Sequence, residues 1–233
     1  MLDTLIASTN PTVAHLNIDM SKPPSMEVVQ AIKSACNQAE DAKDSAVLLV
    51  HISGSDKADN TPLPTPGNIN MVNQWEKALR RLERVNAITV SVVKGQCNGI
   101  GMTLMLATDY RIIERDTKLG LVLENGGVMP GMTLYRLVNQ IGMPWAKRMA
   151  LLGEQLTSEK ANALGLVDIV SDDCDSATAM FLESLVQIDT TDLSIRRRLL
   201  LDASSMSYEE AVGSHLAACD RYLRNLTEEV VCE

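Results

Sequence analysis

Hydrophobic and polar residues follow two different periods along the first two-thirds of the chain. Residues 12–19 alternate apolar and polar positions, which is typical of a strand with one buried face. Residues 46–53 and 88–95 are continuous apolar runs, typical of strands buried on both faces. Residues 26–42 and 69–85 instead place apolar side chains at helical spacing. Strands that alternate with helices predict an α/β fold with a mostly parallel sheet.

The remainder of the chain predicts shorter elements and then a helical end. We expect, in order, a helix running into a strand at 102–112, a short strand at 117–121, a helix at 132–152 interrupted at Gly142–Pro144, a capped helix at 157–166 and a short strand at 167–170. From residue 176 onward the pattern is helical. The organisation that follows is a core of residues 1–175 and a C-terminal helical region of residues 176–233.

One long segment inside the core has no regular pattern. Residues 55–68 contain three prolines and a glycine, which forbid regular structure, and a loop of this length is usually functional or mobile. The helix that follows carries four basic residues away from its apolar stripe, Lys77, Arg80, Arg81 and Arg84. They form either a solvated face or a docking surface for an acidic partner or a phosphate.

Composition excludes several classes of partner. The 233 residues are enough to form a hydrophobic core without disulfides or bound metals. The net charge is −9, and aromatic residues make up only 3% of the chain. Nucleic acids and anionic membranes both attract basic surfaces, so neither is an expected partner. The five cysteines show no CxxC or metal-ligand spacing, and the chain starts without a signal-peptide pattern. We therefore expect free thiols, a cytoplasmic protein and no metal site.

The candidate active region is the turn Gly95–Gly101, with sequence GQCNGIG. A buried strand ends there and a helix begins, so unpaired N–H groups and the positive end of a helix dipole face the turn. Glycines allow a ligand to approach the backbone closely. The turn therefore suits an oxyanion or a phosphate, although a tight strand-to-helix connection explains the same residues.

Five segments resemble the crotonase (enoyl-CoA hydratase/isomerase) superfamily in order and near-family spacing: KGQCNGIG, ATDYRI, KLG, VMPG and LLGEQLTSEKANALGLVD. The resemblance covers about residues 12–170. It implies a ClpP/crotonase-like spiral of ββα repeats in residues 1–175 and a helical oligomerisation region in residues 176–233. It also implies coenzyme A thioesters as substrates, no permanently bound cofactor, and a homotrimer or hexamer.

The resemblance also implies an oxyanion hole made of two backbone N–H groups. One donor maps to Ile100, between Gly99 and Gly101, and an isoleucine supplies an N–H as well as a glycine does. The second donor maps near Thr61, immediately before Pro62, in a loop that lacks the family's AGAD motif. Gly54 or Ser55 is the alternative source of that donor.

The family's two catalytic glutamates map to positions that are not acidic, Thr103 and Leu123. Glu124, one residue later, is the nearest carboxylate, and Thr103 is the other candidate for moving protons. Hydration needs both a base and an acid, so standard enoyl-CoA hydration is not expected. Lys22 lies where the family often places a cation near coenzyme A, and a solvated loop lysine is the alternative.

Three functions remain open. The stretches NQWEKALRRLERV, MLATDYRI and PGMTLYRL are similar to the DpgB-type auxiliary crotonases of 3,5-dihydroxyphenylglycine biosynthesis. These proteins assist a type III polyketide synthase, beside a second crotonase, in dehydrating and aromatising an intermediate to 3,5-dihydroxyphenylacetyl-CoA. The second reading is an independent enoyl-CoA hydratase or isomerase that uses Glu124 alone. The third is a non-catalytic scaffold that binds the synthase.

Overall fold

The computed structural model describes residues 12–20, 25–42, 47–53, 69–121, 131–186 and 193–231, with side chains described as far as residue 224. The chain divides into two compact units, Met1–Gln187 and Ile188–Glu233. The first unit holds the sheet and the candidate active region, and the second consists of two helices.

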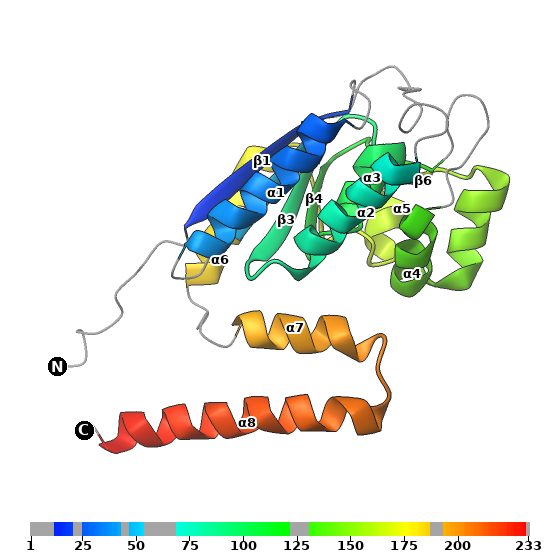
Figure 1. Ribbon diagram of the computed structural model, residues 1–233. Helices are drawn as coiled ribbons and strands as arrows, with labels where there is room; N and C mark the ends of the chain where they lie inside the picture. The colour runs from blue at the N-terminus through cyan, green and yellow to red at the C-terminus, as the bar shows by residue number, and fades with distance from the viewer. Residues whose placement is uncertain are drawn as a thin grey trace. The chain divides into compact units, whose positions relative to one another are not determined.

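A five-stranded parallel sheet forms the centre of the first unit (Figure 1). Its strands, in spatial order, are β1 (Val13–Asp19), β2 (Val47–Ser53), β3 (Ile88–Lys94), β4 (Tyr110–Glu114) and β7 (Ile169–Ser171). Every neighbouring pair is parallel, as in the register Val13↔Val47 between β1 and β2. The predicted α/β fold with a parallel sheet is therefore confirmed.

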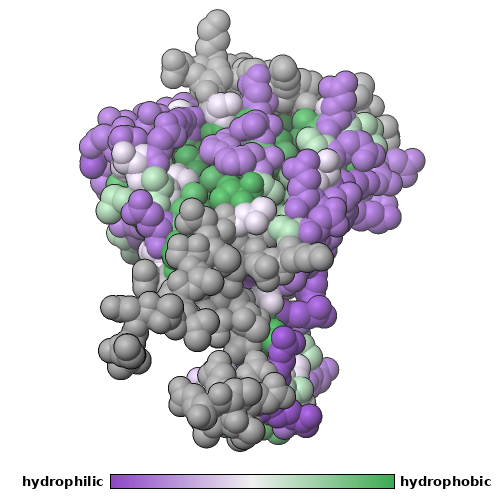
Figure 2. Space-filling model, turned by 90° about the vertical axis from the view of Figure 1, so that its left-hand side faces the viewer, coloured by the Kyte–Doolittle hydropathy of each residue, from purple (hydrophilic) through white to green (hydrophobic). Residues whose placement is uncertain are grey.

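Helices cover both faces of the sheet. α1 (Met26–Asp41) and α2 (Ile69–Arg84) bury their apolar stripes in the larger core cluster on one face. α6 (Cys174–Val186) packs against β3, β4 and β7 on the other face, over a smaller cluster. Several hydrophobic residues of that smaller cluster are only partly buried, and Figure 2 shows hydrophobic residues framed by hydrophilic ones on the first unit.

Shorter elements follow the candidate turn. α3 (Gly99–Met105) leads into β4, and β5 (Lys118–Leu119) pairs antiparallel with β6 (Leu156–Thr157), a strand that the sequence pattern does not predict. α4 (Gly131–Leu152) is interrupted at Gly142, whose φ is 75°, before Pro144, as predicted. α5 (Ser158–Ala163) starts at the predicted cap, where the Thr157 hydroxyl accepts a hydrogen bond from the N–H of Lys160 at 3.3 Å.

The boundary between the two units lies later than the sequence pattern places it. The expected boundary after residue 175 falls within α6, whereas α6 packs on the sheet of the first unit. The rings of Phe181 on α6 and Tyr110 on β4 stack with centroids 4.2 Å apart, which explains why α6 belongs with the sheet. The second unit contains α7 (Leu193–Ala203) and α8 (Tyr208–Val231).

Two further findings concern the cysteines and the helices of the described residues. Cys36, Cys97 and Cys174 are buried free thiols and Cys219 is an exposed one, as predicted, while Cys232 lies outside the described residues. Within the described ranges, every helix is too short or too polar to cross a bilayer.

Candidate functional site

The turn between β3 and α3 is fixed by backbone hydrogen bonds on both sides. The N–H of Gly95 donates to the Glu114 carboxylate at 3.0 Å. The N–H of Cys97 donates to the Lys118 carbonyl, and the N–H of Gly120 donates to the Cys97 carbonyl, each at 3.0 Å. Gly95 and Gly99 have φ of 79° and 48°, in the left-handed region where a side chain is strained. The turn thus needs both glycines and has little freedom to move.

The first two N–H groups of α3 have no hydrogen-bond acceptor within the part of the chain that the structure describes. Asn98 is the N-cap in extended conformation, and its carbonyl accepts the N–H of Gly101 at 3.0 Å. Among the described residues, the N–H groups of Gly99 and Ile100 have no backbone acceptor. The Oδ1 atom of Asn98 is also buried without a described hydrogen-bond partner. This end of α3 therefore has N–H donors without an intrahelical acceptor, as the first turn of a helix does.

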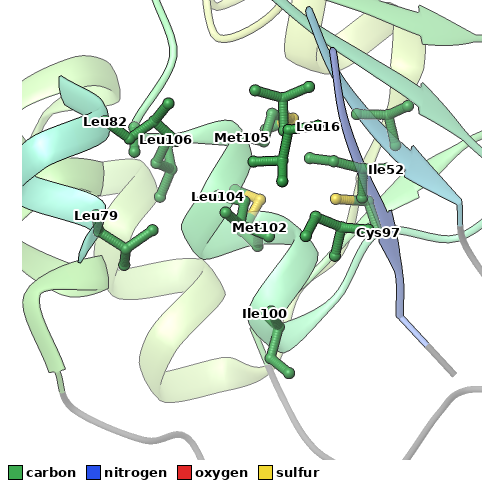
Figure 3. Close-up of a cluster of buried hydrophobic side chains, with 14 of the residues drawn as sticks. Leu16, Ile52, Leu79, Leu82, Cys97, Ile100, Met102, Leu104, Met105 and Leu106 are labelled. Carbon is green, nitrogen blue, oxygen red and sulfur yellow. The ribbon is translucent and has the colours of Figure 1, made fainter. Parts of the chain in front are cut away.

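The body of α3 is packed into the larger core cluster (Figure 3). Met102, Leu104 and Met105 are fully buried. Ile100 is 8% exposed, and in Figure 3 it points away from the other labelled side chains, at the start of the helix. A Cβ atom at Gly101 would lie 1.8 Å from the sulfur of Met20, so only glycine fits there without rearrangement. Packing therefore fixes the direction in which the open N–H groups point.

Thr103, which we predict from the resemblance to take the place of a family glutamate, uses its hydroxyl in two hydrogen bonds. It donates to the Gly99 carbonyl at 2.9 Å and lies 2.9 Å from the hydroxyl of Thr133 on α4. Because Thr103 has given its one proton to Gly99, Thr133 donates to Thr103. Thr103 is only 6% exposed, so the structure places it as a contact between α3 and α4. A proton-transfer role for Thr103 remains a prediction.

The other end of α3 is closed by two side chains. Arg111 on β4 is 7% exposed and donates to the carbonyls of Met105, Thr108 and Leu166, each at 2.9 Å. Burial lowers the pKa of Arg111 to about 10, so it is still protonated at neutral pH. Gln140 on α4 donates to the Leu106 carbonyl at 2.9 Å. The arginine of the ATDYRI segment is therefore a helix-capping residue.

Arg136 connects the two helices that follow the undescribed loops. Its guanidinium on α4 forms ion pairs with Glu76, at 3.0 Å, and with Glu83, both on α2. The N–H of Met132 also donates to Glu76 at 3.2 Å. Arg136 is 6% exposed, so this contact is shielded from water and fixes the start of α4 against α2. The sequence pattern does not predict the two glutamate partners.

Several predicted site residues lie outside the described residues: Lys22, Gly54, Ser55, Thr61 and Glu124. Their roles remain predictions. The described elements show only where these segments begin and end in the sequence. Residues 54–68 lie between the end of β2 at Ser53 and the start of α2 at Ile69. In the same way, residues 122–130 follow Leu121 and precede α4.

The basic face of α2 is largely occupied by partners within the chain. Arg81 bonds to Glu40 and Asn37 on α1, at 2.8 and 2.5 Å, and Arg80 pairs with Glu83 at 3.2 Å. These contacts favour a solvated face over a docking surface for an acidic partner. Across the described ranges, no three His, Cys, Asp or Glu side chains gather closely enough to hold a metal ion.

Comparison with known proteins places this geometry in context. The family model for enoyl-CoA hydratase/isomerase matches residues 53–193. A curated protein from Amycolatopsis orientalis named enoyl-CoA-hydratase is 38% identical over 209 residues, which cover 90% of this chain and 95% of that protein.

Solved structures resemble the fold. A crystal structure of enoyl-CoA hydratase from Bacillus anthracis has a TM-score of 0.78 and 16% identity, covering 90% of this chain and 86% of that one. A structure of a Thermobifida fusca YX protein, named as an enoyl-CoA hydratase in complex with CoA, has a TM-score of 0.77 and 18% identity. It covers 94% of this chain and 93% of that one.

Proposed function

Because the chain belongs to the enoyl-CoA hydratase/isomerase family and has its α/β crotonase fold, we propose that it acts on an acyl-CoA thioester. The observation that carries the proposal is the start of α3, where the N–H groups of Gly99 and Ile100 lack a described backbone acceptor. In the proposed complex, the Ile100 N–H donates to the thioester oxygen, and Gly54, Ser55 or Thr61 supplies the second donor. Lys22 would contact the coenzyme A portion.

A donor placed at the thioester oxygen stabilises the enolate that forms when an α-proton leaves. The rigid turn around Gly95 and Gly99 supports this role, because a preorganised donor needs no rearrangement as charge develops. Removing one such donor costs about 3–4 kcal/mol of transition-state stabilisation in other enzymes. The −9 net charge does not oppose this role, because the oxygen is bound by backbone groups.

We propose isomerisation, with Glu124 as the single acid and base. Thr103 and Thr133 bond to each other where a family glutamate would lie, so Thr103 contributes no carboxylate. Isomerisation moves one proton and one carboxylate can carry it, whereas hydration needs two groups. Incubation of the purified chain with a 3-enoyl-CoA tests this proposal, and we expect double-bond migration that E124Q abolishes.

The same buried threonine pair favours a second candidate, the auxiliary role beside a type III polyketide synthase. Aromatisation supplies its own driving force, so weak acid–base assistance is enough for 3,5-dihydroxyphenylacetyl-CoA formation. The test adds the chain to a type III synthase with malonyl-CoA, with and without a second crotonase. A higher yield of aromatic product supports this candidate, and hydration of crotonyl-CoA by the chain alone contradicts it. Inactivity in every assay supports a scaffold.

We also propose that the second unit mediates assembly into a homotrimer or hexamer. α7 contributes no buried residue, and large apolar side chains on α7 and α8 are exposed, with Leu200 at 75% and Leu216 at 63%. Such residues are expected at a contact between subunits. Light scattering of the full chain measures the oligomeric state, and a monomer at micromolar concentration would contradict the proposal.

A further inference from the structure

Two histidines meet on the sheet face that α6 partly covers. His15 on β1 and His51 on β2 alternate with Leu16 and Ile52, which face the core cluster under α1 and α2. Nδ1 of His15 lies 3.2 Å from Nε2 of His51. The two ring planes are within 9° of parallel, and their centroids are 5.4 Å apart, so the contact is made by the nitrogens rather than by stacked faces.

This separation between the nitrogens is close to that of two ligands on one metal ion. Zinc–nitrogen bonds of about 2.0–2.1 Å in a tetrahedral site place two ligand nitrogens about 3.3 Å apart. The observed 3.2 Å needs only a tilt of the rings for both lone pairs to converge on one ion. An ion bound there takes the place of the proton that otherwise bridges the two nitrogens.

The backbone holds the two rings at this spacing in advance. β1 and β2 are hydrogen-bonded neighbours, with Asn17 opposite His51 in the register. His51 is partly buried between strands, whereas His15 is exposed, so an ion can enter from the side of His15. Because both ligands lie on strands, binding requires little ordering of the chain.

The charged groups facing the pair balance each other. Lys94 on β3 and Asp175 on α6 both act electrostatically on His51, and they form an ion pair with each other at 2.9 Å. A cation beside His51 therefore meets no net repulsion from them. Since the described residues offer no third His, Cys, Asp or Glu ligand, water completes the coordination.

We propose that His15 and His51 form an exchangeable binding site for a divalent transition-metal ion of the zinc, nickel and copper class. Imidazole nitrogens suit these ions, whereas magnesium and calcium prefer oxygen ligands. The site lies on the opposite sheet face from the core cluster that contains α3, so it is independent of the proposed acyl-CoA chemistry.

Calorimetric titration of the full, reduced chain with ZnCl₂ and NiCl₂ tests the site. We expect one ion per chain, with binding weakened at least about tenfold in H15Q and in H51Q. H215Q is the matched control, because His215 is the third histidine of the sequence and is exposed on α8. His215 also lies four residues before the exposed Cys219, which makes a competing ligand pair on that helix.

Each outcome decides for or against the proposal. Binding that survives in H15Q and H51Q but not in H215Q would assign the ion to α8 and overturn it, as would the absence of binding by the wild-type chain. A second measurement covers the case in which a variant does not fold. Diethylpyrocarbonate modification of wild-type protein, mapped by mass spectrometry, should be slowed by zinc at His15 and His51 and unchanged at His215. Equal slowing at all three histidines would contradict the site.

Discussion

The two ends of α3 differ in whether their backbone polar groups have hydrogen-bond partners. At the first residues, the N–H groups of Gly99 and Ile100 have no described backbone acceptor. At the last turn, Arg111 and Gln140 donate to the carbonyls of Met105 and Leu106. Both ends belong to a helix of 7 residues in one core cluster, so burial alone does not explain the difference. The fold closes the negative end of the helix with a cation, whereas the positive end has two N–H groups without a backbone acceptor among the described residues.

Removing the Arg111 guanidinium at the C-terminal end of α3 should have the largest effect, which is on stability. R111M leaves the buried carbonyls of Met105, Thr108 and Leu166 without that donor, and we expect a loss of about 3 kcal/mol in the free energy of unfolding. Urea denaturation measures it. R115M is the control, because among the described residues Arg115 makes an exposed ion pair with Asp172, and its substitution should leave the free energy of unfolding nearly unchanged. Equal stability of the two variants would contradict the capping role.

Removing a donor at the open end should affect turnover. I100P lacks the N–H, and proline is tolerated in the first turn of a helix, so we expect a decrease in kcat/KM of roughly 100-fold on an acyl-CoA substrate. I100V keeps the N–H and controls for the change of side chain. If the folded I100P turned over at the rate of I100V, Ile100 would not be an oxyanion donor.

Removing the buried hydroxyl of Thr103, which lies between the two ends of α3, should have a smaller effect on stability. T103V removes two hydrogen bonds without changing side-chain shape, and we expect it to lower the free energy of unfolding by about 1–2 kcal/mol. T178V is matched, because Thr178 on α6 is also buried and donates to the carbonyl four residues earlier, at Cys174. The difference between the two variants isolates the contact with Thr133. We also expect E124Q to reduce turnover more than T103V does, and the reverse order would move the proton-transfer role to Thr103.

The smallest expected effect is on the chemical reactivity of the Cys97 thiol, which lies just before the first residues of α3. Burial raises the pKa of Cys97 to about 12 and that of Cys36 to about 11, so both remain protonated and unreactive at pH 8. Among the four described cysteines, only the exposed Cys219 should react with a thiol reagent in native protein. Peptide mapping after timed labelling measures this, and denaturant provides the fully labelled control. Rapid labelling of Cys97 at pH 8 would mean that the turn opens to solvent.

Much of the fold follows from hydrophobic periodicity, because local pattern and tertiary burial agree there. The strands at Val13–Asp19, Val47–Ser53 and Ile88–Lys94, and the helices on either side, lie within a residue or two of their predicted bounds. β6 is two residues long and pairs with β5. A strand this short has no hydrophobic period of its own, so the sequence pattern does not predict it. α6 joins the first unit through the contact of Phe181 with Tyr110, which is 71 positions away and invisible to a local pattern.

The candidate site was predictable in position but not in its contacts. The glycines and the strand-to-helix change indicate the turn before α3, and the motif order places Ile100 in it. The partners of Arg111 and Arg136 could not be inferred, because they depend on which helices and loops meet in space. The contact between His15 and His51 could not be inferred for the same reason. The two histidines are 36 positions apart, and they meet only because their strands pair.

Arg111, which caps α3, makes one of its own hydrogen bonds to a residue that is synthesised long after the helix. The Leu166 carbonyl is one of the three acceptors that hold Arg111, and β7 pairs with β4 only from Ile169 onward. A nascent chain that has emerged from the ribosome only as far as residue 160 therefore has an Arg111 that lacks one of its three acceptors and an uncovered edge on β4. Ribosome pausing or truncation in this interval should leave the intermediate open to chaperone capture, whereas a stop after Val186, once β7 and α6 have both covered β4, should not.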